Sequence, residues 1–265
     1  MTEATPKSNP SAADAASIAL FFDAMSGTRN ALFRSNPILE YEQQVRSGAV
    51  LERLGASRGE MILDLGCGNA RDIPPMLHAG ATVVGVDLSP GMIEQAKDDL
   101  AALAYHDVQL EVGDATRLRF ADATFDKIVC SEVIEHIPDA GAAVREMYRV
   151  LKPRGLLVLS TPNRRSWYGF DRYVVWERLL RRRWNHPFDN WRTLEELQDL
   201  LTRHGFEVSS RQTVCFLPGF LLTYRLPSTS LQAWIARSVG RAEKGLRRFA
   251  PANGYLLTMT ALKRG

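Results

Sequence analysis

The chain has 265 residues, of which 45% are hydrophobic and 24% are charged, and these fractions are those of an ordinary soluble globular protein. This length favours one sizeable α/β domain with insertions over two full domains. The formal net charge of +3 is too small to indicate nucleic-acid binding by itself, and we expect no DNA partner.

The N-terminal stretch and the cysteines predict where the protein resides. Residues 1–17 have no basic region followed by a long apolar core, so we do not expect a secretory signal there. We expect a disordered tail over these residues and a single domain over 18–265. No apolar run approaches the ~18 residues of a membrane span. The widely separated Cys67, Cys130 and Cys215 predict reduced, buried thiols without disulfides. We therefore expect a cytoplasmic protein.

From Glu40 onward, helix and strand patterns alternate along the chain. An amphipathic helix ends at Gly55, and apolar runs typical of buried strands follow at residues 61–66, 82–89, 108–114, 125–130 and 155–161. Helical segments separate several of these runs. This order predicts a Rossmann-like α/β fold, with a mostly parallel sheet and helices on both of its faces.

Two segments interrupt this rhythm, 163–192 and 215–252, and the last two strands are expected at 206–214 and 254–264. Insertions in such sheets usually lie over the carboxyl end, so we expect both segments to form one helical cap over one site. The first mixes arginines with aromatic residues, which could stack RNA bases, line a pocket for a lipophilic acidic molecule, or form a solvated basic face. The second predicts a helix that packs on the domain or makes peripheral contact with an anionic membrane.

Acidic residues stand at the ends of three consecutive predicted strands. Asp64 precedes a turn that contains Gly66 and Gly68, and Asp87 and Asp114 end the next two strands. Glycines at such a turn allow close approach of a ligand to the backbone. Three aligned carboxylates suit a positively charged nucleoside without phosphates. A bulky Arg71 replaces the third glycine of a dinucleotide-binding motif, which counts against an NAD-dependent oxidoreductase.

The stretches DLGCGNA, GVDLSPGMIEQAK, GDATRLRFADATFDKIVCSEVIEHIPD and LKPRGLLVLSTPN resemble successive motifs of the class I S-adenosylmethionine-dependent methyltransferases. The resemblance covers about residues 44–163. It implies a seven-stranded sheet whose last strand is antiparallel, with S-adenosylmethionine as the cofactor.

The resemblance also implies residue roles in cofactor binding. Gly66 and Gly68 would lie beside the methionine part, Asp87 would hold the ribose, and Asp114 would hold the adenine with the backbone N–H of Ala115. The full set of implied cofactor contacts is Asp64, Gly66, Cys67, Gly68, Asp87, Leu88, Met92, Asp114, Ala115 and Ser131.

The stretch SEVIEHIPD places Glu132, Glu135 and His136 directly after the fourth predicted strand, on one face of a helical turn. These residues resemble those of two branches of the family, the ubiquinone-biosynthesis O-methyltransferases and the small-RNA 2′-O-methyltransferases. In the second branch such residues bind a divalent metal, and His186 is the candidate fourth ligand here. Two imidazoles and two carboxylates favour Mn²⁺, Fe²⁺, Co²⁺ or Zn²⁺. The alternative is a polar helix start with no metal.

A hydroxyl acceptor must lose its proton during methyl transfer, and His136, His186 or Glu135 could accept that proton. The apolar character of the second segment favours a small lipophilic acceptor over RNA. We therefore expect O-methylation of a small hydrophobic phenol or alcohol, such as a quinone precursor or secondary metabolite. The alternatives are a metal-dependent RNA ribose 2′-O-methyltransferase, a C-methyltransferase acting on an isoprenoid, and a non-catalytic cofactor-binding protein.

Overall fold

The computed structural model describes residues 15–181, 186–216, 228–249 and 252–265. Most of the predicted tail over 1–17 lies outside these residues, and its last three residues begin the first helix. Parts of both predicted cap segments, 182–185, 217–227 and 250–251, also lie outside.

The described elements alternate as the sequence predicts. The helical elements are α1 (Ala15–Ser35), α2 (Pro37–Leu54), α3 (Ile73–His78), α4 (Pro90–Ala102), the 3-10 turn η2 (Ile134–His136), α5 (Ala140–Val150), α6 (Trp167–Phe170), the π-helix η3 (Asp171–Leu179), α7 (Leu194–Arg203) and α9 (Thr229–Phe249). The strands are β1 (Met61–Leu65), β2 (Thr82–Asp87), β3 (Gln109–Val112), β4 (Phe125–Ser131), β5 (Leu151–Pro162), β6 (Phe206–Val214) and β7 (Leu256–Lys263).

Within the described residues, seven strands form one sheet in the order β3-β2-β1-β4-β5-β7-β6. All neighbouring pairs from β3 to β5 are parallel, and β7 is antiparallel to both β5 and β6. The order reverses at β1, so the loops after β1 and β4 diverge to opposite sides and open a crevice at the carboxyl edge. The expected sheet with an antiparallel last strand is confirmed.

The central strands are apolar on both faces because each face is covered by helices. In β1, Ile62 belongs to a buried cluster with α2, α3 and α4, whereas Leu63 belongs to the opposite cluster with α5 and α7. Both side chains are fully buried. Alternation of side chains across a strand explains this division, and truncation of Leu63 to alanine would cost about 2–5 kcal/mol.

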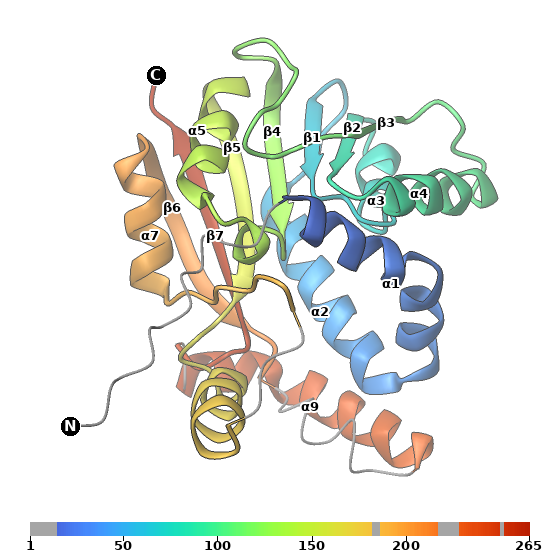
Figure 1. Cartoon of the computed structure of the whole chain (residues 1–265), viewed down its shortest axis with the longest axis vertical. Helices are drawn as coiled ribbons and strands as arrows, with labels where there is room; N and C mark the ends of the chain where they lie inside the picture. Colours follow the sequence, from blue (N-terminus) through green and yellow to red (C-terminus); the bar gives the residue numbers. More distant parts are fainter. Residues whose placement is uncertain (1–14, 182–185, 217–227, 250–251) are drawn as a thin grey trace.

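Helices α1 and α2 lie at the carboxyl edge of the sheet, with α9 beyond them (Figure 1). Helix α1 packs against α4 and α2, and α9 packs against α2. Asn36 caps α2 by accepting from the backbone N–H groups of Ile38 and Leu39, and Gly55 ends the helix at φ 52°, as its sequence predicts. No helix in the described part of the chain is long and apolar enough to cross a membrane.

Candidate active site

A cavity lies at the carboxyl edge of the sheet. Its volume is about 1150 Å³ when the space at its open mouth is included. The ends of β1, β2 and β4 and the loop after β3 contribute to its walls. The ten residues expected from the resemblance to contact the cofactor all line this one cavity: Asp64, Gly66, Cys67, Gly68, Asp87, Leu88, Met92, Asp114, Ala115 and Ser131.

The turn after β1 needs glycine for two different reasons. Gly66 has φ 75°, and a Cβ at this position would lie 2.1 Å from Cγ2 of Val133. Gly68 has φ 53° with nothing within 4 Å of a Cβ, so it leaves open space at the cavity wall. Ala70 also adopts a positive φ, 61°, at a local cost of about 1–2 kcal/mol.

The carboxylate of Asp87 joins two loops. Its Oδ2 accepts from the backbone N–H of Gly68 at 2.8 Å, and its Oδ1 accepts from that of Ser89 at 2.9 Å. Asp114 accepts from both the backbone and the hydroxyl of Thr116, each at 2.8 Å. The buried Asp64 has a pKa raised well above its ordinary value, because of burial first and the nearby Asp72 and Asp87 second.

Helices α1 and α2 line the cavity with Ile18, Phe22, Gln43 and Arg46. The sequence analysis missed these four residues, because they lie on helices before the first strand and no motif marks them. The described parts of 163–192 and 215–252, which were predicted to cap the site, contribute no residue to this cavity.

Helix α1 is attached to the first turn of α4 by Asp23. Its Oδ1 accepts from the backbone N–H of Gly91 at 2.9 Å and from the hydroxyl of Ser89, the N-cap residue of α4. A carboxylate is favourable at a helix N-terminus. This contact holds α1 beside the cavity.

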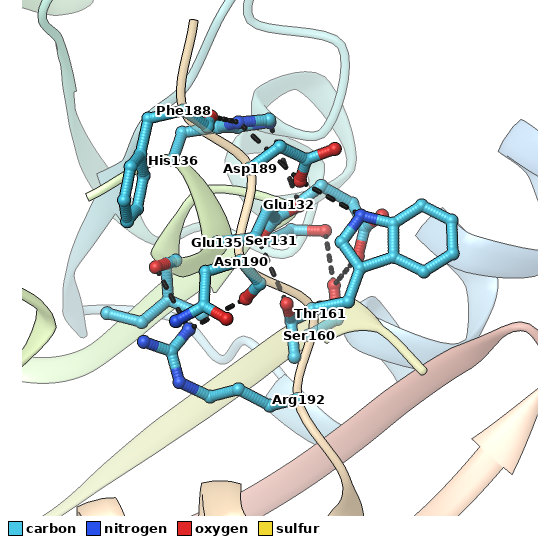
Figure 2. Close-up of polar contacts among 12 residues, drawn as sticks. Ser131, Glu132, Glu135, His136, Ser160, Thr161, Phe188, Asp189, Asn190 and Arg192 are labelled. Atoms are coloured by element: carbon cyan, nitrogen blue, oxygen red, sulfur yellow. Dashed lines mark hydrogen bonds and ion pairs between the residues drawn. The ribbon is translucent and has the colours of Figure 1, made fainter. Parts of the chain in front are cut away.

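The helical turn predicted over Glu132, Glu135 and His136 begins later than expected. Glu132 has φ 58°, and η2 covers only Ile134 to His136, so the three residues do not share one helical face. Oε1 of Glu132 accepts from Oγ of Ser160 at 3.2 Å, and its backbone N–H donates to the Ser160 carbonyl at 3.1 Å. Glu132 therefore lies against β5 at the cavity wall (Figure 2).

Glu135 is buried and is not among the residues that line the cavity. The residue is 1% exposed, and its Oε2 accepts from Oγ1 of Thr161 at 3.0 Å. Burial, and secondly the charge of Asp189, raise the pKa of Glu135 to about 8. Burial and the neighbouring Glu135 raise the pKa of Glu132 to about 8 as well. Both carboxyls are thus largely protonated near neutral pH.

His136 lines the cavity, and its tautomer follows from its hydrogen bond. Nδ1 lies 3.1 Å from the carbonyl oxygen of Phe188 (Figure 2). A carbonyl oxygen can only accept, so Nδ1 carries a proton, and in a neutral ring Nε2 is then the nitrogen that can accept one. Nε2 is 3.8 Å from Oε1 of Glu135, too far for a hydrogen bond.

His186 is not among the residues lining the cavity. Its ring stacks on that of His136 at a centroid distance of 5.3 Å with an 11° interplanar angle, and it also packs on Phe21 at 4.6 Å. Among the described residues, no three His, Cys, Asp or Glu side chains are grouped to hold a metal ion. The predicted metal set of Glu132, Glu135, His136 and His186 is therefore not supported, because Glu132 and Glu135 bond to different hydroxyls of β5 while the imidazoles stack face to face.

Known proteins share this sequence pattern and fold. A family model described as "Methyltransferase domain" matches residues 63–159. A ubiquinone biosynthesis O-methyltransferase of Rhodopseudomonas palustris is 30% identical over 197 residues, which cover 72% of this chain and 73% of that protein. One of Azorhizobium caulinodans is 32% identical over 61% of this chain and 64% of its own length. A demethylmenaquinone methyltransferase of Beutenbergia cavernae is 37% identical over 46% of this chain and 49% of its own length.

A solved SAM-dependent methyltransferase of Thermotoga maritima superposes with a TM-score of 0.66 at 19% identity, covering 93% of this chain and all of that one. This likeness shows that the chain has a Rossmann-like fold. The chain belongs to the class I S-adenosylmethionine-dependent methyltransferases. It spans 64% and 49% of the length of two of the relatives above, so their own reactions bear on this chain only as proposals.

Proposed function

We propose that this protein transfers the methyl group of S-adenosylmethionine to the hydroxyl of a small hydrophobic phenol or alcohol. One observation carries the proposal: an imidazole whose free nitrogen can accept a proton, that of His136, lines the same cavity as the ten residues expected to contact the cofactor. The relatives named for quinone pathways support an acceptor of this kind.

The residues present fit the cofactor. Gly68 leaves open space at the cavity wall where the methionine part would lie, and Asp87 offers carboxylate oxygens at the end of β2 for the ribose. Asp114 and the backbone N–H of Ala115 would meet the adenine. When bound, S-adenosylmethionine supplies an electrophilic methyl group on a positively charged sulfur.

His136 is the favoured general base. Glu135 lies outside the cavity lining and has a raised pKa, so it is a poor proton acceptor near neutral pH. His186 does not line the cavity, and its ring packs on those of His136 and Phe21. Nε2 of His136 would accept the hydroxyl proton as the acceptor oxygen attacks, while the Phe188 carbonyl keeps the ring in the required tautomer.

The cavity walls near His136 suit an apolar acceptor. Ile18 and Phe22 of α1 face the cavity together with Val133 and Ile137 from the segment around η2. Such walls would exclude water from the reacting hydroxyl and favour an aromatic or aliphatic ring. The metal-dependent RNA alternative is not favoured, because the residues that the structure describes hold no metal-binding group.

The test is incubation of the purified protein with S-adenosylmethionine and a panel of phenols, catechols, alcohols and isoprenoid quinone precursors. Mass spectrometry would detect the addition of one methyl group, and NMR would assign it to oxygen or to carbon. We expect O-methylated phenols, formed equally well with EDTA present. Methylation only of carbon would favour the isoprenoid alternative, and no binding of S-adenosylhomocysteine would contradict the proposal as a whole.

A further inference from the structure

The segment 188–192, which precedes α7, lies along the η2 turn and is bonded to it. The carbonyl of Phe188 accepts from Nδ1 of His136 at 3.1 Å, and the backbone N–H of Asn190 donates to the carbonyl of Glu135 at 2.8 Å (Figure 2). Residues 188–192 are not among those that line the cavity. Their influence on the site therefore passes through the ring of His136, which does line it.

An ion pair between two buried side chains holds this segment in place. Nη1 of Arg172, in η3, donates to Oδ2 of Asp189 at 2.7 Å, and its Nη2 donates to the backbone carbonyl of Asp189 at 2.8 Å. The two side chains are only 6% and 5% exposed. A planar guanidinium that bonds both the carboxylate and the main chain of one residue fixes the position and the orientation of that residue.

Two aromatic residues complete the surroundings of this ion pair. The guanidinium carbon of Arg172 lies 4.8 Å from the ring centroids of both Tyr173 and Trp191. Trp191 is 3% exposed, and its Nε1 donates to Oδ1 of Asp189 at 2.9 Å. Both carboxylate oxygens of Asp189 are thus bonded, and the residue is a fixed anchor directly after Phe188.

Asp189 reaches the imidazole of His136 through the peptide chain. Its Oδ1 is 4.0 Å from Nδ1 of His136, which is too far for a hydrogen bond. The group bonded to Nδ1 is instead the carbonyl of Phe188, the preceding residue. Because the bond made by one ring nitrogen decides which nitrogen carries the proton, a shift of this carbonyl would free the ring to carry its proton on Nε2.

We propose that the ion pair of Arg172 and Asp189 positions His136, by holding the Phe188 carbonyl against Nδ1 so that Nε2 stays open to the proton of the acceptor. Arg172 and Asp189 do not line the cavity, so they are positioning residues and not catalytic ones. The inference rests on the proposed function, because the pair matters for methyl transfer only if His136 is the base.

The first arm of the experiment measures steady-state kinetics with a phenol that the wild type methylates. Asp189→Ala should lower kcat by about tenfold or more, since a misplaced catalytic group is slow, while KM stays close to the wild-type value. Asp189→Asn keeps an oxygen for Nη1 of Arg172 and should recover most of the lost kcat. Glu177→Gln is the matched control. Glu177 accepts from Nε of Arg172 at 3.3 Å, its side chain is 35% exposed, and this variant should keep the wild-type kcat.

The second arm observes the tautomer directly by nitrogen NMR of the neutral His136 ring, with His136→Gln used to assign its signals. The wild type and Asp189→Asn should carry the proton on Nδ1, whereas Asp189→Ala should carry it on Nε2 in a large fraction of the molecules. This measurement needs no acceptor, so it tests the ion pair separately from the reaction.

Loss of one charge leaves its buried partner uncompensated, so Arg172→Met/Asp189→Ala, which removes both charges, is measured beside the single variants. It should show the same loss of kcat and the same change of tautomer. A folded variant without the ion pair that keeps the wild-type tautomer, whatever its kcat, would overturn the inference and leave the methyltransferase proposal intact. Failure of the wild type to methylate any hydroxyl compound would instead contradict the proposed function.

Discussion

The carboxylate of Asp87 connects two loops at the edge of the cavity. Its two oxygens already hold the backbone N–H groups of Gly68 and Ser89, so the loops after β1 and β2 are fixed relative to each other before any ligand enters. Carboxylates have several lone-pair directions, so we propose that ribose hydroxyls donate to the same two oxygens.

We expect Asp87→Ala to weaken S-adenosylhomocysteine binding by about 10–100-fold, because hydrogen bonds to a charged group contribute roughly 1.5–3 kcal/mol. Calorimetry would measure the affinity, and circular dichroism would show whether the fold is retained. Asp98→Ala, at an exposed position of α4, is the control and should bind normally. Normal affinity in a folded Asp87→Ala protein would contradict the assigned cofactor site.

His136 and His186 form a natural pair of test positions, because their rings stack but only one of them lines the cavity. We expect His136→Gln to lower kcat by about 100-fold or more, since glutamine cannot accept the proton. Affinity for S-adenosylhomocysteine should change little. His186→Gln should keep kcat within a few fold, and a greater loss in this second variant would point to His186 as the base.

Among the elements, α2 is joined to α6 by a partly buried hydrogen bond. The hydroxyl of Tyr168 donates to Oε1 of Glu42, and burial raises the pKa of Glu42 from 4.5 to about 7. Because the folded state holds the proton more tightly than the unfolded state, this carboxyl favours folding most at low pH.

The contribution of Glu42 should be fully present below pH 4.5 and be lost as the pH rises to about 7. The free energy of unfolding of the wild type, relative to Glu42→Gln, should fall by up to about 3 kcal/mol across this range. Glutamine keeps the acceptor oxygen for Tyr168 and does not titrate. Urea titrations at a series of pH values would measure the difference, and a pH-independent difference would refute the raised pKa.

Helix α1 is held beside the cavity through Asp23 at the first turn of α4. Loss of such a cap costs about 1 kcal/mol, so Asp23→Ala should release S-adenosylhomocysteine several-fold faster and expose α1 to proteolysis. Asp23→Asn keeps an acceptor oxygen and should behave more like the wild type. Stopped-flow dissociation rates would measure this, and identical rates in all three proteins would show that α1 does not retain the ligand.

At the scale of the whole molecule, α9 presents apolar and cationic side chains outward together. Trp234 is 61% exposed and Leu231 is 41% exposed, and the exposed Arg237 and Arg241 follow on the same face of the helix. The buried face of α9 instead includes Glu243, which accepts from the hydroxyl of Tyr41 and the backbone N–H of Cys215. An aromatic and arginine-rich face of this kind suits an anionic lipid surface.

We therefore expect the protein to co-sediment with vesicles that contain phosphatidylglycerol and not with pure phosphatidylcholine vesicles. Binding should weaken at high salt, because surface charges are screened. Trp234→Ala should bind the phosphatidylglycerol vesicles more weakly than the wild type, with an unchanged melting temperature. Equal binding of the wild type and Trp234→Ala would show that α9 is not the contact surface.

The sequence by itself determined the sheet and most of the predicted cofactor site. Apolar runs separated by helical segments predict a parallel sheet. Because parallel strands end at one edge of the sheet, Asp64, Asp87 and Asp114 lie close together at that edge. The turn after β1 could also be predicted from the sequence, because the left-handed conformation of Gly66 and Gly68 is one that glycine adopts without steric cost.

Only the tertiary structure decided which residues beyond the motifs line the cavity and what surrounds the ionisable side chains near it. Phe22 and Arg46 reach the cavity through helix packing that no local pattern records. The tautomer of His136 depends on the carbonyl of Phe188, 52 residues away. The raised pKa of Glu135 depends on its burial, where it bonds to Thr161 of β5, and on the charge of Asp189. Periodicity reports which way a side chain faces along its own element, whereas these properties arise from contacts between segments far apart in the chain.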